Sequence, residues 1–148
     1  MTRIQQLQQE INTLISSQTF QGNPPALYAP IAYIMGQGGK RLRPLLTLMA
    51  CDLFEGNISD ALYPALAVEM FHNFTLVHDD IMDKAPLRRG KETVYKKWNA
   101  DIAILSGDTM FALAYQYTLK TKTQLVPSIL QVFSKAAIEV CEGQQLDM

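Results

Sequence analysis

The spacing of apolar residues predicts helices along almost the whole chain. Near the N-terminus, apolar residues recur at intervals of three and four: Ile4, Leu7, Ile11, Leu14 and Ile15. This spacing indicates an amphipathic helix. No stretch alternates between apolar and polar residues as a half-buried strand does, so strands are not expected. The pattern therefore predicts an all-α fold with long helices and short connections.

Proline, glycine and capping residues set the boundaries of the other predicted helices. These cover roughly residues 26–35, 44–54, 61–83, 99–120 and 127–148. Pro44 is expected to open one helix, since proline fits a first helical turn. Ser59 or Asp60 is expected to cap the next, with Pro64 in its first turn. The last helical pattern is still running at residue 148, so we expect the chain to be the front part of a larger domain.

Composition and charge narrow the classes of ligand. Apolar residues make up 48% of the chain, and the net charge is −1, which argues against a general nucleic-acid binder. The basic residues nevertheless gather in two clusters, one of Lys40, Arg41 and Arg43, the other of Lys84, Arg88, Arg89, Lys91, Lys96 and Lys97. Compact basic clusters in a near-neutral protein indicate binding of a small anion.

The cysteines, the N-terminus and the hydropathy of the chain indicate where the protein is located. Cys51 and Cys141 lie far apart without metal-ligand spacing, which is typical of free thiols in a reducing compartment. The N-terminus is polar and has no signal-peptide core, and residues 102–119 carry too many polar side chains for a membrane span. We therefore expect a cytoplasmic protein.

An acidic cluster lies at the predicted end of the 61–83 helix. Asp79 and Asp83 are four residues apart and share one helix face, and Asp80 is offset by roughly 100°. Carboxylates at this spacing repel each other, which a bound divalent cation would offset. Oxygen ligands without paired cysteine or histidine favour magnesium, which binds through one or two carboxylates plus a substrate phosphate.

An ordinary solvated helix end is the alternative interpretation of this cluster. Two observations favour the metal site. Negative charge is disfavoured at a helix C-terminus by the helix dipole. The following loop carries Arg88 and Arg89, whose guanidinium groups are suited to phosphate oxygens. Metal, diphosphate and arginine together make a coherent anion site.

Three further residues of the same helix invite competing interpretations. Glu69 and His72 resemble half of a di-iron site, but the only other histidine, His78, provides no second half. His72 lies about two turns before Asp79 on the same face, so either a structural role or a phosphate contact remains open. His78 is expected to be structural.

The segment GQGGKRLRP, residues 36–44, is a second candidate anion site. It is not a P-loop, because Lys40 is not followed by serine or threonine and no strand is predicted before it. A glycine turn linking two helices needs no function. The alternative is a phosphate site, in which Lys40, Arg41 and Arg43 lie beside backbone that a ligand can approach closely.

Five short motifs, in this order, resemble the trans-type isoprenyl diphosphate synthases, also called the polyprenyl synthetase family. They are GGKRLRP (38–44), HDDIMD (78–83), LRRG (87–90), GD (107–108) and GQQLDM (143–148). Five in order are highly specific, and the resemblance covers nearly the whole chain. It implies the N-terminal portion of the isoprenoid synthase helical bundle.

The resemblance also implies roles for individual residues. Asp79 and Asp83 match the family's first aspartate-rich motif, which binds Mg²⁺ on an allylic diphosphate, and Asp80 is its middle member. Arg88 matches an arginine that contacts the allylic diphosphate. Residues matching those that hold isopentenyl diphosphate are Lys40, Arg43, His72 and Arg89. Gln144 and Asp147 match a stretch near the family's catalytic cavity.

The implied reaction is 1'-4 elongation of an allylic diphosphate by isopentenyl diphosphate. Bulky side chains before the aspartate motif set product length in this family. Phe71 and Phe74 stand at such positions, and the motif has no insertion between Asp80 and Asp83. This pattern resembles a short-chain enzyme making farnesyl or geranylgeranyl diphosphate, and a homodimer is the usual assembly.

This chain departs from the family in its length. Family members are about twice as long, and residues 1–148 end before a second aspartate-rich motif. We therefore expect a single truncated domain that is inactive alone. A terpene cyclase-like enzyme is one alternative, against which a second diphosphate site argues. A non-catalytic subunit of a heteromeric synthase is the other, against which the intact aspartate motif argues.

Overall fold

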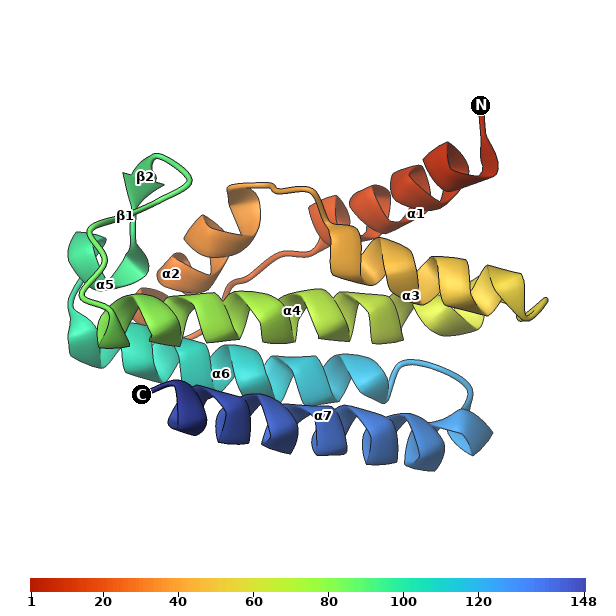
Figure 1. The fold of residues 1–148 in the computed structure, drawn as a ribbon. Coiled ribbons are helices and arrows are strands. Elements are labelled where there is room, and N and C mark those ends of the chain that lie inside the picture. The colour runs from red at the N-terminus through yellow and green to blue at the C-terminus, as the bar shows by residue number, and fades with distance from the viewer.

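A computed structural model describes all residues, 1–148, as a bundle of helices with one small hairpin (Figure 1). The helices are α1 (Arg3–Ser17), α2 (Pro25–Gly36), α3 (Leu42–Leu53), α4 (Ile58–Met82), α5 (Val94–Lys97), α6 (Ala100–Thr118) and α7 (Val126–Asp147), with a 3₁₀ turn η1 (Thr123–Leu125) before α7. The two strands are β1 (Leu87–Arg88) and β2 (Lys91–Glu92). The all-α prediction is confirmed, apart from this hairpin.

Helix α4 is the central element of the bundle. It packs along α6 on one side and against α3 and α1 on the other, while α7 lies along the outer side of α6 (Figure 1). Its buried residues surround the helix rather than forming one stripe, as expected for a helix with neighbours on several sides. The last turn of α4 carries Asp79 and Asp80, so the central helix also presents the acidic cluster.

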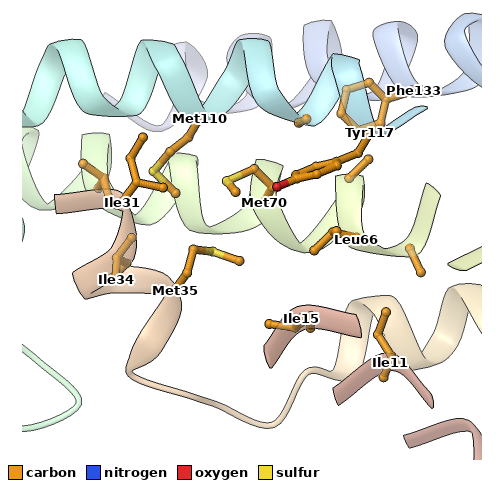
Figure 2. Close-up of a cluster of buried hydrophobic side chains, with 14 of the residues drawn as sticks. Ile11, Ile15, Ile31, Ile34, Met35, Leu66, Met70, Met110, Tyr117 and Phe133 are labelled. Carbon is orange, nitrogen blue, oxygen red and sulfur yellow. The ribbon is translucent and has the colours of Figure 1, made fainter. Parts of the chain in front are cut away.

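The hydrophobic core joins α4 to its neighbours. Figure 2 shows Ile31 of α2 beside Met110 of α6, and Ile11 and Ile15 of α1 on the side of α4 that carries Leu66. All of these side chains belong to one buried cluster, together with Ile34, Met35, Met70 and Tyr117. Leu66 and Met70 are fully buried. Burying side chains of this size stabilises the fold by about 1.5–3 kcal/mol each. The core therefore fixes the position of α4 against α2 and α3, whose connection carries the glycine turn.

Helix α3 begins at Leu42 and not at Pro44 as predicted. Three further details of the predicted secondary structure were wrong. Helix α4 begins at Ile58, because Asn57 caps it by accepting a hydrogen bond from the Ser59 amide at 3.1 Å. Pro64 consequently lies in the second turn, where it leaves the carbonyl of Asp60 without an intrahelical donor. The Thr121 hydroxyl donates to that carbonyl at 2.7 Å and offsets the loss.

The third error concerns residues 84–93, which were predicted to be a loop. They form the antiparallel hairpin β1–β2, in which Arg88 pairs with Lys91. The two turn residues, Arg89 and Gly90, have φ of 53° and 77°, the left-handed conformation that two-residue hairpins favour. Two-residue strands are too short to show an alternating pattern, which explains why the sequence did not predict them. Separately, no helix is both long and apolar enough to cross a membrane.

Candidate functional site

The acidic cluster, which includes Asp79, lies where α4 ends. Burial raises the pKa of Asp79, and the neighbouring carboxylate of Asp83 raises it further. The Asp83 amide donates to the Asp79 carbonyl at 2.8 Å, so the helical geometry continues to Asp83. Both side chains therefore lie one turn apart on one face, and a nearby cation would relieve the charge of Asp79.

Asp80 differs from the other two aspartates because its carboxylate is already paired. Its oxygens accept from Nε of Arg88 at 2.9 Å and from Nη2 at 2.8 Å, a bidentate ion pair. Asp80 is 3% exposed. Charge-assisted bidentate pairs combine strength with fixed orientation. Asp80 thus holds Arg88 beside the acidic cluster, and the Nη1 group of Arg88 has no hydrogen-bond partner within the chain.

The hairpin directs two adjacent arginines to two different places. Arg88, in β1, pairs with Asp80 at the end of α4. Arg89, in the turn, donates from Nη1 to the carbonyl of Gly38 at 2.9 Å, in the connection between α2 and α3. The backbone of Gly39 has φ of 141°, and a Cβ there would lie 3.0 Å from Nη1 of Arg89. Glycine at 39 therefore makes room for the Arg89 guanidinium.

A pocket of about 470 Å³ opens beside this contact, and we call it the basic pocket. Its walls come from the glycine turn, the start of α3, the middle of α4 and the hairpin turn. The lining residues are Gly39, Lys40, Arg41, Leu42, Arg43, Glu69, His72 and Arg89. Four cationic side chains thus surround it with a single carboxylate. Such a concentration of positive charge is suited to a compact anion.

His72 takes part in the basic pocket as a neutral imidazole. Its Nε2 lies 3.4 Å from Nη1 of Arg43. Burial lowers the pKa of His72, and the positive charge of Arg43 lowers it further. The structure thus places His72 beside Arg43, a candidate phosphate-binding residue. The carboxylate of Glu69 accepts from Nη1 of Arg41 at 2.8 Å.

An apolar cavity of about 350 Å³ adjoins the basic pocket between α4 and α7. The two cavities share Arg43 and His72, and the apolar one is otherwise lined largely by α4 and α7 residues, including Phe71, Thr75 and Phe133. Phe74 does not line it. The ring of Phe74 instead packs against Phe71, with ring centres 5.3 Å apart.

The other residues singled out from the sequence lie at the edges of this region. His78 packs against the ring of Phe74 and directly over Gly107, where a Cβ would lie 2.3 Å from its Nε2. The glycine of the GD motif therefore has a packing role that the sequence did not reveal. Gln144 and Asp147 lie near the end of α7, and neither lines the two cavities.

The donor set at the end of α4 fits a hard divalent cation that keeps other ligands. Asp79 and Asp83 offer carboxylate oxygens, and no group of three or more histidine, cysteine or acidic side chains converges as a complete metal site. Magnesium is commonly held by one or two carboxylates, with water and substrate phosphate completing its octahedron. Burial and the carboxylate of Asp83 raise the pKa of Asp79 more than the charge of Arg88 lowers it, so a further cation would stabilise the ionised form.

Comparisons with known proteins agree on one family. The polyprenyl synthetase family model matches residues 24–148. A geranylgeranyl diphosphate synthase of Methanosarcina mazei is 43% identical over 84% of this chain and 39% of its own length. A short chain isoprenyl diphosphate synthase of Methanocaldococcus jannaschii is 38% identical over 98% and 43%.

Solved structures give the same result. The crystal structure of a geranylgeranyl pyrophosphate synthase is 48% identical and superposes with a TM-score of 0.91, covering 98% of this chain and 44% of that one. The likeness therefore extends over the whole described fold, and the predicted bundle type is confirmed. The chain spans less than half the length of the relatives it matches.

Proposed function

This chain belongs to the polyprenyl synthetase family, and on that premise we propose that it provides the diphosphate-binding half of a short-chain prenyltransferase. The reaction proposed is the 1'-4 condensation of isopentenyl diphosphate with an allylic diphosphate. One observation carries the proposal: a single hairpin supplies Arg88 to an acidic cluster and Arg89 to a separate basic pocket. Two neighbouring anion sites of different chemistry suit two diphosphates held in different ways.

The acidic cluster is the proposed site of the allylic diphosphate. Asp79 and Asp83 would hold Mg²⁺, which when bound neutralises the diphosphate and makes it a better leaving group. Arg88 would donate its remaining Nη1 protons to the same diphosphate, because Asp80 holds the other edge of the guanidinium. In this arrangement Asp80 orients Arg88 and does not itself bind the metal.

The basic pocket is the proposed site of isopentenyl diphosphate. Lys40, Arg43 and Arg89 would bind its diphosphate oxygens directly, without a metal ion. Neutral His72 would donate one further hydrogen bond beside Arg43. The adjoining apolar cavity between α4 and α7 offers hydrocarbon surroundings next to the same two residues.

Positioning and charge stabilisation account for the proposed chemistry. The bond between the allylic carbon and its diphosphate breaks, and the diphosphate leaves with the electron pair. The double bond of isopentenyl diphosphate then attacks the allylic carbocation, and the released diphosphate accepts a proton from the resulting cation, which completes the new double bond. Arg88 stabilises the departing charge, while the fixed spacing of the two sites keeps the reacting carbons in reach. Aromatic walls at Phe71 and Phe133 would keep water from the cation.

Product length is proposed to be limited by Phe71 and Phe74. These rings pack against each other and against Phe111, and so fill the space behind the acidic cluster. In the complete enzyme, replacing Phe74 with alanine should open this space and lengthen the products, as measured by chromatography of the hydrolysed prenols. Phe54→Ala, at a side chain 83% exposed, is the matched control. An unchanged product distribution in the Phe74 variant would refute its role.

Assembly and location are proposed from the family as well. We propose a cytoplasmic homodimer whose interface covers exposed apolar side chains of α6, among them Ile104 and Leu105. A charged substitution, Leu105→Glu, should shift the mass measured by light scattering toward that of a monomer. The proposal fails if the wild-type chain is monomeric at micromolar concentration.

The deciding experiment uses a chimera. Residues 1–148 are joined to the part of the Methanosarcina mazei relative that lies beyond its match. With Mg²⁺ and isopentenyl diphosphate, the chimera should elongate dimethylallyl, geranyl or farnesyl diphosphate. The chimera carrying Asp79→Asn is the control, and should lose activity. Absence of elongated product with every primer would overturn the proposal, whereas cyclised hydrocarbon would indicate a terpene cyclase.

A further inference from the structure

We infer that Glu69 is a positioning residue for the basic pocket and acts through Arg41. This inference rests on the proposed function and adds to it a residue pair that need not touch the ligand. Arg41 and Glu69 form an ion pair of 2.8 Å, with side chains 10% and 5% exposed. No spacing rule pairs them, since they are 28 residues apart.

Arg41 joins three helices at one point. Its Nη1 donates to Oε1 of Glu69 in α4, and its Nη2 donates at 2.8 Å to the carbonyl of Met35 in the last turn of α2. Arg41 itself occupies the N-cap position directly before α3. Because the guanidinium is planar and makes both contacts, it fixes the distance and direction between these helix ends.

Glu69 is fixed in turn by Asn73, one helical turn further along α4. The Asn73 amide donates to the carbonyl of Glu69 at 2.9 Å and to its Oε1 at 3.1 Å. Asn73 is fully buried. The carboxylate therefore accepts from Arg41 and Asn73 at the same oxygen, and its orientation is set before any ligand arrives.

This network fixes the backbone from which the side chains of Lys40 and Arg43 extend. Arg41 has φ of 51°, a left-handed conformation that is unfavourable for a side chain with a Cβ. Its two buried contacts hold that conformation in place. Lys40 directly precedes Arg41, and Arg43 follows two residues later, so the backbone at Arg41 sets the direction of both side chains into the pocket.

A purely electrostatic role and a positioning role of Glu69 predict changes in anion affinity of opposite sign. It is the only carboxylate among the residues that line the basic pocket. If its charge acted only on the ligand, neutralising it would strengthen binding of an anion. If Glu69 positions Arg41 and thereby Lys40 and Arg43, neutralising it weakens binding. The sign of the change in affinity therefore separates the two roles.

The experiment measures binding of inorganic pyrophosphate to the full chain by calorimetry in metal-free buffer. Glu69→Gln should weaken binding by roughly tenfold, the lower end of what loss of a supporting partner costs at a ligand site. Arg41→Lys should also weaken it although the charge is kept, because an ammonium group cannot reproduce both contacts. Asp52→Asn, which breaks the exposed Arg3–Asp52 pair, should leave the affinity unchanged.

Thermal unfolding, measured on the same samples, shows whether each variant is folded at the temperature of the titration. If Glu69→Gln is unfolded at that temperature, the affinity of Arg41→Lys for pyrophosphate is compared with wild type in its place. If the folded variant binds pyrophosphate as tightly as wild type or more tightly, the positioning role is overturned, while the proposed pocket stands. If the wild-type chain itself does not bind pyrophosphate, the proposed pocket fails first, and the inference falls with it.

Discussion

The acidic cluster and the basic pocket are built in contrasting ways. Asp79 and Asp83 lie one turn apart at the end of α4, where burial and the neighbouring carboxylates raise the pKa of Asp79 more than Arg88 lowers it. The cations of the basic pocket come from several segments of the chain, with buried contacts behind them. The acidic cluster thus needs a cation that arrives with the ligand. The basic pocket is organised in advance by the protein.

This difference implies different sensitivities. A site of two carboxylates on one helix depends on its donors and on the cation that joins them. A site assembled from several segments also depends on residues that hold those segments together, such as Arg41 and Gly39. Helix α4 and the hairpin are common to both sites. A substitution in one site should therefore leave ligand binding at the other unchanged, unless it moves α4 or the hairpin.

The largest effect is expected at Asp79. Asp79→Asn removes one of two proposed metal ligands, so Mg²⁺-dependent binding of pyrophosphate should fall by about a hundredfold. Metal-free binding in the basic pocket should stay unchanged. Calorimetry with and without Mg²⁺ measures both. Asp101→Asn, at an exposed aspartate in the first turn of α6, is the control. Loss of the metal-free binding as well would show that the two sites are not separate.

The reverse experiment is made at Arg43. Arg43→Met removes a cation of the basic pocket, and metal-free binding of pyrophosphate should weaken by about tenfold, as expected for a charge-assisted contact. The Mg²⁺-dependent component should remain. Lys135→Met removes a charge from a side chain 77% exposed on α7 and should change neither. A loss confined to the Mg²⁺-dependent component would contradict the assignment of Arg43.

A smaller effect is expected at Gly39. An alanine there is strained at φ of 141° and crowds Arg89, which can move away from the Gly38 carbonyl. We expect metal-free affinity to fall severalfold. Gly36→Ala, where a Cβ would meet nothing within 4 Å, is the matched control. A parallel fall in Mg²⁺-dependent binding would show that Arg89 moves the hairpin, and Arg88 with it.

These contrasts also explain how much of the molecule could be predicted from its sequence. Apolar spacing together with proline and glycine boundaries located six helices, each of which is at least 12 residues long. It missed α5, which is four residues long, and the hairpin, whose two-residue strands carry no period. The start of α4 was misplaced because the Asn57 side chain competes well with Ser59 and Asp60 as a cap.

The two sites also differ in how far sequence spacing can predict them. Asp79 and Asp83 can be placed together from spacing alone, since an α-helix brings residues four apart to one face. No spacing rule joins Arg41 to Glu69 or Arg89 to Gly38, which are 28 and 51 residues apart. Only the resemblance to a family grouped Lys40, Arg43, His72 and Arg89. It said nothing of Glu69, which became visible through its buried contacts.

The smallest effect concerns stability in the absence of metal. Because the pKa of Asp79 is raised in the folded state, its ionised form opposes folding at neutral pH. This penalty should disappear as pH falls through the raised pKa toward the unfolded value of 3.8. Asp79→Asn should therefore be more stable than wild type at pH 7 by a few tenths of a kcal/mol, since Asp79 is largely solvent-screened.

The difference in unfolding free energy between wild type and Asp79→Asn, measured with urea, should shrink toward zero near pH 4. Taking the difference between the two proteins cancels the pH dependence of unfolding that arises from all other groups. Adding Mg²⁺ and pyrophosphate at pH 7 should reverse the order, because ligands that bind the folded state stabilise it and only wild type keeps both proposed metal ligands. A variant less stable than wild type without metal would mean that the chain already compensates the charge of Asp79. The contrast between the acidic cluster and the basic pocket would then be wrong.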